Sequence, residues 1–373
     1  MMRSLALLLA LSSTLAVAGL ACAKPATAPS SSSALSADDY EALLTPEAAP
    51  IGFRRSLVAD EYFWLRTKAL EGEAPPEFTE ALTASREIRA ELGSDPEAFE
   101  DLEVPLGSVR AGRDLLARYG ELPKLKDVGG RPVAFQSKAL RLARAIDATE
   151  GAYFSGPYRE HAEWVARASK DLLARVVPHE AAIVAAIDKD IGLGGAARPV
   201  VVTLVGDAPY PGIFAADDRG HAMATFVRVR GVEASDLAEV VLHEAIHALD
   251  EMSVRLPTDM NQLRKAFEQR GIDETNVEMA MNTVTFAEAS SLVRRFVDPS
   301  HKPMGESGFY ALYPPAPAIV EAWEKHIAGE PIQKTAEAIA TAIAGPVSPV
   351  ESSGPSASLP SSEEGSGPAG AGF

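Results

Sequence analysis

The chain has 373 residues, a single cysteine and a formal net charge of −17 at pH 7. A negative charge of this size repels nucleic acids and anionic membrane surfaces, so the sequence predicts neither as an electrostatic partner. One cysteine allows no disulfide within the chain and no thiolate cluster. A bound metal would therefore be held by histidine and carboxylate groups.

Residues 1–21 have the pattern of a secretory signal peptide, because Arg3 precedes an apolar run too short to span a membrane comfortably. The run ends in Gly19-Leu20-Ala21-Cys22, which resembles the signal of bacterial lipoproteins, whose cysteine becomes the lipidated first residue. Ordinary signal-peptidase cleavage after Ala21-Cys22-Ala23 is the alternative. We expect an exported protein of the cell envelope that meets the membrane only through a lipid on Cys22. In the alternative it is periplasmic or secreted.

Composition divides the rest of the chain into four parts. Residues 22–36 are rich in Ala, Pro and Ser and predict a flexible tether, and residues 345–373 predict a disordered tail. Residues 37–190 have a helical pattern interrupted at pairs such as Gly129-Gly130 and Gly156-Pro157. Residues 191–344 combine strand and helix patterns. The predicted fold class is mainly α with a small β-sheet, an α+β architecture.

Two strands and a helix follow one another in the second half of the body. Residues 200–205 form an apolar run that predicts a buried strand, and a second strand is expected near 222–229. A helix then begins within residues 233–236, where Asp236 and Glu239 have the spacing of a capping box.

This helix carries the motif His243-Glu244-Ala245-Ile246-His247. Residues four apart on an α-helix lie about 40° from each other around the axis, so both imidazoles can face one metal ion. Zinc at a catalytic site takes three protein ligands and leaves one position for water, which Glu244 could deprotonate. The apolar residues lie on the opposite face of the helix, so we expect it to form the floor of a cleft: Val241, Leu242, Ala245, Ile246 and Leu249.

The motif and the preceding strands resemble the zincin metallopeptidases. The resemblance covers roughly residues 199–297 and is specific only at the HEXXH motif itself. It implies a Zn²⁺ cofactor, a peptide or protein substrate, Glu244 as general base, and a strand beside the motif helix that pairs with an extended substrate. Two alternatives remain open: a zinc amidohydrolase of the cell envelope that does not act on peptides, and a cell-surface binding lipoprotein without catalysis.

The third zinc ligand must come from elsewhere in the chain. Ser253 stands where the metzincin pattern requires a histidine, which excludes that subfamily. The remaining pattern resembles the gluzincins, in which a later helix supplies a glutamate. Within the helix expected at residues 273–296, Glu288 shares a face with apolar residues, where an unpaired charge would be costly, and it is the predicted ligand. Glu278, His301 or no third protein ligand remain as alternatives.

Further polar residues are candidates for supporting roles. Asp250 lies one turn beyond His247 and could orient its imidazole, although an ordinary surface aspartate fits equally well. Hydrolysis also needs a donor for the developing oxyanion. His301, Tyr310 and Tyr313 follow the glutamate-bearing helix and are the candidates; their spacing does not select one of them.

Overall fold

The computed structural model describes residues 44–45, 49–93, 97–216 and 223–344. The predictions for the signal peptide at 1–21, the lipid on Cys22, the tether at 22–36 and the tail at 345–373 lie outside these residues. In the described part, no helix is both long and apolar enough to cross a membrane. The described chain is mainly helical with a small mixed sheet, which confirms the predicted α+β class.

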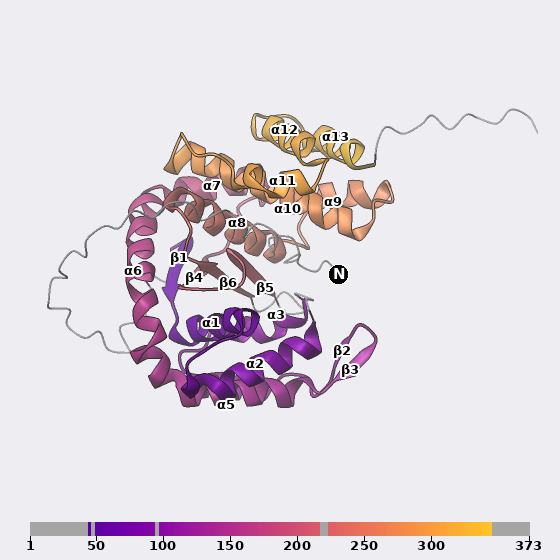
Figure 1. The fold of residues 1–373 in the computed structure, drawn as a ribbon. Coiled ribbons are helices and arrows are strands. Elements are labelled where there is room, and N and C mark those ends of the chain that lie inside the picture. The colour runs from indigo at the N-terminus through magenta and orange to yellow at the C-terminus, as the bar shows by residue number, and fades with distance from the viewer. Residues whose placement is uncertain (1–43, 46–48, 94–96, 217–222, 345–373) are drawn as a thin grey trace, which may run out of the picture.

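A four-stranded sheet with the order β1-β4-β6-β5 lies at the centre of the molecule (Figure 1). The predicted strands are β4 (Val200–Val205) and β6 (Met223–Arg228), which are parallel to each other. The sequence did not reveal β1 (Ile51–Arg55), which is parallel to β4, or the edge strand β5 (Gly212–Ala216), which is antiparallel to β6. Since β1 joins β4, the sheet crosses the predicted boundary between residues 190 and 191.

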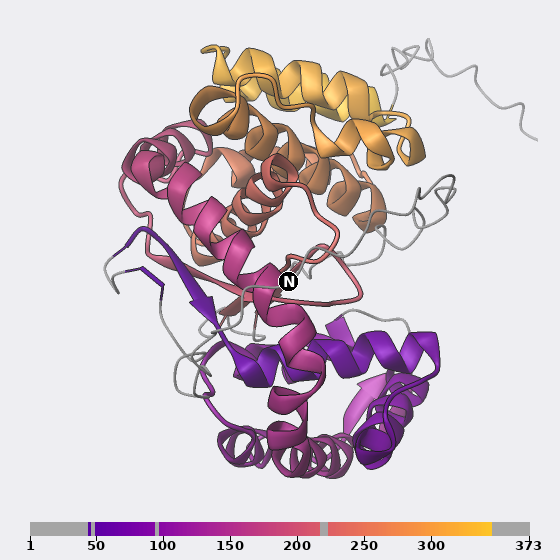
Figure 2. The ribbon, with the colours of Figure 1, turned by 60° about the vertical axis from the view of Figure 1, so that its left-hand side comes forward.

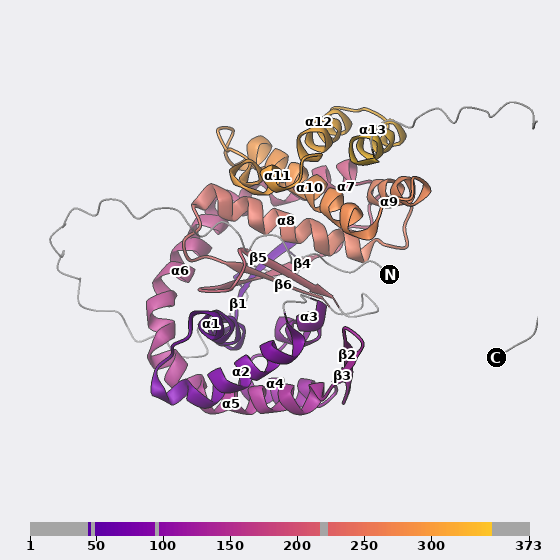
Figure 3. The same ribbon diagram turned by 45° about the vertical axis from the view of Figure 1, so that its right-hand side comes forward.

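Helices cover both faces of the sheet, as Figures 1 and 3 show. The helices on one face come from the first half of the chain: α1 (Leu57–Glu71), α2 (Thr79–Leu92), α3 (Glu97–Glu103), α4 (Gly112–Tyr119) and α5 (Phe135–Ser155). On the other face lie α8 (Ala234–Met252) and, above it, α10 (Glu274–Leu292). The outer helices of this side are α7 (Glu180–Asp190), α9 (Asp259–Gln269), α11 (Phe309–Leu312), α12 (Ala316–Ile327) and α13 (Ile332–Ala344).

Helix α6 (Pro157–Arg175) runs from one helical layer to the other along the side of the sheet (Figure 2). The two layers enclose two apolar cores, one on each face. Successive side chains of β6 point to opposite faces of the sheet and so enter both cores. Phe226 packs into the core that contains α1, and Val227 packs into the core that contains α8. The motif helix therefore lies in the larger of the two cores.

The Gly129-Gly130 pair, predicted as a break in helical structure, is the turn of a short hairpin. It joins β2 (Lys126–Val128) to β3 (Arg131–Val133), and both glycines have positive φ, at 60° and 81°. A two-residue hairpin turn with positive φ at both positions favours glycine. The strands themselves are only three residues long, so no periodicity revealed them.

The motif helix α8 is buried on nearly all sides, in contrast to the expected cleft floor with one open face. Its apolar face packs on the sheet and its histidine face packs on α10. The predicted capping box is wrong: the N-cap is Glu233, with no side-chain cap, and Asp236 and Glu239 instead lie against His301. Helix α10 begins as expected, with Asp273 accepting a hydrogen bond from Asn276 N, and continues as one π-helical turn, Val293–Val297.

Candidate metal centre

The two motif histidines converge on each other. Nε2 of His243 lies 3.0 Å from Nε2 of His247, and the rings are inclined by 77°. Two nitrogens bound tetrahedrally at 2.0–2.1 Å to one zinc ion would be about 3.3 Å apart, close to this separation. The pair therefore fits two positions of a zinc site.

Aromatic rings from two elements flank the pair. Phe286 of α10 lies with its ring centroid 4.1 Å from that of His243. Phe214 of the edge strand β5 stacks nearly parallel to His247, at 6.2 Å. The histidines thus lie between β5 and α10, and His247 is the less buried of the two.

Burial keeps both imidazoles neutral. It lowers the pKa of His243 well below 6.5, and the neighbouring His247 lowers it further, while a hydrogen bond with Asn282 opposes the change. Burial also lowers the pKa of His247, against the opposing effects of Asp250 and Asn282. A neutral imidazole keeps a lone pair for a metal, so the electrostatics suit ligands.

Asn282 is a site residue that the sequence did not single out. It is buried on α10 and interacts with both imidazoles. In the sequence, an asparagine among the apolar residues of a long helix could equally face solvent. Only the packing of α10 on α8 shows that Asn282 belongs to the site.

The carboxylate of Glu244 lies against the backbone of Gly212, at the start of β5. A Cβ at Gly212 would come within 2.2 Å of Oε1 of Glu244, so only glycine leaves this carboxylate its place. Burial raises the pKa of Glu244 to about 8. A carboxyl group with a pKa near neutrality is suited to general acid–base work.

The structure does not bring Glu288 to the histidine pair. Its side chain is fully buried and accepts a hydrogen bond from Nε1 of Trp323 at 2.9 Å, from α12. On α10, Glu288 lies about 160° around the helix axis from Phe286, which contacts His243. The sequence correctly predicted a buried carboxylate in an apolar stripe, but this stripe faces α12 and not α8.

Burial and the nearby Asp190 raise the pKa of Glu288 to about 8, so the carboxyl group is largely protonated at neutral pH. Arg295 binds Asp190 at 2.8 Å, and Arg294 binds Glu324 at 3.0 Å. Neither arginine pairs with Glu288 in these contacts. The loss of its charge and the hydrogen bond from the indole lower the free-energy cost of burying this carboxyl group.

Among the described residues, no group of three or more His, Cys, Asp or Glu side chains is placed to hold a metal ion. In the described part of the chain, the structure thus supplies two histidine ligands and no carboxylate that completes a three-residue metal site with them.

Asp250 is neither solvent-exposed nor bound to an imidazole. Its carboxylate is buried and forms an ion pair with Arg264 of α9, including a hydrogen bond of 2.8 Å to Nη1. It acts on His247 through its charge, which favours the protonated imidazole.

The three candidate oxyanion donors contact other groups. His301 bonds to Glu239, Tyr313 donates to the carbonyl of Asn276 at 3.2 Å, and the hydroxyl of Tyr310 is buried against Gly305 without a hydrogen-bond partner. None of these recorded contacts is with the histidine pair.

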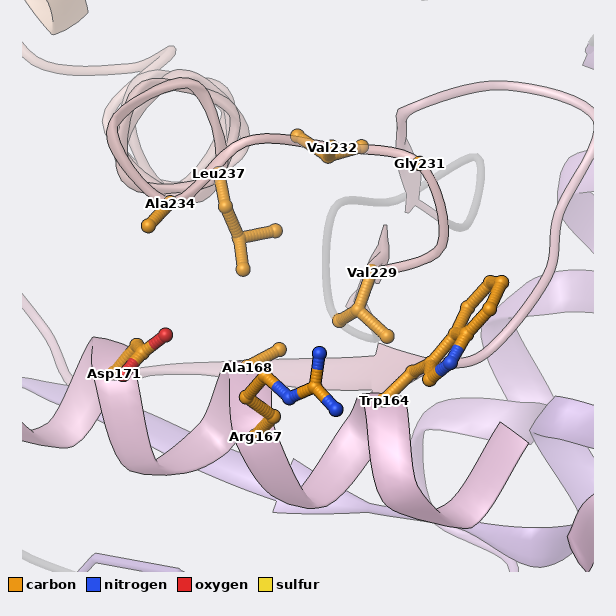
Figure 4. Close-up of a pocket in the computed structure, with 9 residues that line it drawn as sticks. All are labelled: Trp164, Arg167, Ala168, Asp171, Val229, Gly231, Val232, Ala234 and Leu237. Atoms are coloured by element: carbon orange, nitrogen blue, oxygen red, sulfur yellow. The ribbon is translucent and has the colours of Figure 1, made fainter. Parts of the chain in front are cut away.

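A pocket of about 220 Å³ lies apart from the histidines, between α6 and the first turn of α8 (Figure 4). Trp164 and Arg167 of α6 face Val229, Val232 and Leu237 across it. It contains no residue of the motif.

Comparison of the chain with protein-family models, with curated proteins and with solved structures finds no match. The class of the protein therefore has to be argued from the site.

Proposed function

We propose that the protein is a zinc-dependent hydrolase of the zincin type that cleaves an amide bond, most simply a peptide bond. The observation that supports this most directly is the 3.0 Å convergence of the two neutral imidazoles on the helix that also carries Glu244, whose carboxylate lies against Gly212 of β5. Zinc bound there would supply a Lewis acid that polarises the scissile carbonyl and lowers the pKa of water.

The residues of the chain have separate tasks in this mechanism. His243 and His247 would hold the metal, and Asn282 interacts with both rings. Glu244 accepts a proton from the attacking water and delivers it to the nitrogen of the leaving amine.

For the third ligand we propose Glu278 in place of Glu288, with its side chain turned from its present position, in which it forms no three-residue metal-binding group with the histidines. His243 contacts Phe286 and Asn282, while His247 interacts with Asn282, so α8 and α10 run antiparallel. Glu278 lies one turn before Asn282 on the same face of α10, and this register directs it toward the His247 end of α8.

The position of β5 at the edge of the sheet favours a substrate that binds in an extended conformation. In the described part of the chain β5 pairs with β6 alone, and it carries Gly212, which lies against Glu244, and Phe214, which stacks on His247. A peptide could add to this edge by main-chain hydrogen bonds, which would bring its scissile bond next to Glu244. We propose that the lipid on Cys22 holds this activity at the membrane of the cell envelope.

The experiment is hydrolysis of a mixture of unmodified peptides by the purified protein and by Glu244→Gln, followed by mass spectrometry. We expect the variant to lose activity by about 10²- to 10⁴-fold, because it lacks the base, and to retain its zinc. Glu268→Gln on α9 removes an exposed carboxylate and serves as the matched control. Cleavage by Glu244→Gln at the wild-type rate would contradict the proposal.

A further inference from the structure

The segment of residues 298–310, here called the strap, crosses α8 one turn before His243. It follows the π-helical turn and contains a short 3₁₀ helix, Met304–Ser307. Two groups of the strap bind one carboxylate oxygen of α8: Nε2 of His301 and the backbone N–H of Met304, the latter at 3.0 Å from Oε2 of Glu239.

This attachment is buried. Glu239 is completely inaccessible to solvent and His301 nearly so. Nδ1 of His301 lies 3.8 Å from Oδ1 of Asp236, so both nitrogens of the ring face carboxylates of α8. Oε1 of Glu239 has no hydrogen-bond partner, and the Tyr310 hydroxyl of the strap has none either. The hydrogen bonds recorded for the Glu239 carboxylate are thus both made by the strap.

The other end of the strap reaches the histidine site through aromatic contacts. Phe309 packs on Phe286 with ring centroids 5.2 Å apart, and Phe286 packs on His243 at 4.1 Å. Glu239 and His243 are four residues apart on one face of α8. The strap therefore binds α8 one turn before His243, and its Phe309 packs on the ring that packs on His243.

We propose that the strap is a gate that closes the His243 end of the site, and that Glu239 is the positioning residue that holds the gate shut. A segment held by few hydrogen bonds can open locally while the rest of the molecule stays folded. A role of this gate in substrate access rests on the proposed function. Whether the gate limits access to His243 can be tested independently of that function.

The test measures the reactivity of individual histidines toward diethyl pyrocarbonate, by peptide mapping of the full protein in EDTA. Hydrogen exchange of residues 298–310 is measured on the same samples. The variants are Glu239→Gln, which weakens the attachment from α8, and His301→Gln, which weakens it from the strap. Neither readout needs metal or turnover, so a failure of the proposed hydrolase activity would not affect the result.

The matched control is Asp259→Asn. This substitution removes another carboxylate partner of a histidine, the 3.2 Å contact with His326, in a part of the fold away from the strap. A general loss of stability would act alike in the control and in the two strap variants.

In both strap variants we expect faster exchange in the strap and about tenfold faster modification of His243, the change that follows from losing one hydrogen bond to a charged group. The control should show neither effect. Unchanged His243 reactivity, unchanged exchange in the strap, or an equal increase in Asp259→Asn would each overturn the proposal.

Discussion

Single residues decide the geometry of the site, and the least conspicuous of them is Gly212. The sequence offered no reason to select this glycine, because β5 was not predicted. In the structure its missing side chain is the space that the Glu244 carboxylate occupies. A general base must lie within hydrogen-bonding reach of the water that it activates, so the position of Glu244 depends on this strand.

Gly212→Ala is therefore expected to reduce amide hydrolysis by about a hundredfold, since a displacement of about 1 Å in a catalytic group has effects of this size. Zinc content should stay at the wild-type level, because neither histidine is moved. Gly151→Ala on α5 is the control, as its new methyl group would meet no atom within 4 Å. Wild-type activity in Gly212→Ala would show that Glu244 does not need this position.

For Glu288, the sequence pattern predicted burial but did not determine the partner of the buried carboxyl group. Its apolar neighbours on α10 correctly indicated burial. Two different partners can satisfy a buried carboxyl group, however, a metal ion or a hydrogen-bond donor with loss of charge. The donor, Trp323, is 35 residues further along the chain, and no spacing rule connects the two.

At the scale of elements, the antiparallel packing of α8 on α10 builds the site, and smaller contacts attach the outer helices to one another. His326 at the end of α12 is one of them. Its Nδ1 lies 2.9 Å from the carbonyl of Glu330, and its Nε2 lies 3.0 Å from the carbonyl of Asp190 and 3.2 Å from the Asp259 carboxylate. Acceptors at both nitrogens favour the doubly protonated imidazolium.

These contacts predict a pH-dependent stability. Burial lowers the pKa of His326, but the hydrogen bonds to Asp259, Glu330 and Asp190 outweigh it and raise the pKa above 6.5. The stabilisation is thus complete below pH 6.5 and is lost as the pH rises through the raised pKa. In urea titrations, we expect the free energy of unfolding of wild type to fall across this interval and that of His326→Gln to fall less. Equal losses would contradict the assignment.

At the scale of the whole molecule, distant parts of the chain combine around one sheet. Strand β4 and helix α8 were predicted from local patterns, since an apolar run and a helical ligand spacing are visible in a few consecutive residues. Strand β1 was not, because its pairing with β4 joins residues about 150 positions apart, from 51 to 200. The histidine pair was therefore predictable, while Asn282, Phe286 and Gly212 depended on packing between elements.

The proposed function depends on a zinc site made by His243 and His247 of α8 together with Glu278 of α10. The measurement that tests it most directly is zinc content per chain, by elemental mass spectrometry, in the purified wild type, Glu278→Ala and Glu288→Gln. We expect one zinc per chain in wild type and in Glu288→Gln, and its loss in Glu278→Ala. Zinc retained in Glu278→Ala but lost in Glu288→Gln would contradict the ligand assignment, and wild type that binds no zinc would contradict the site itself.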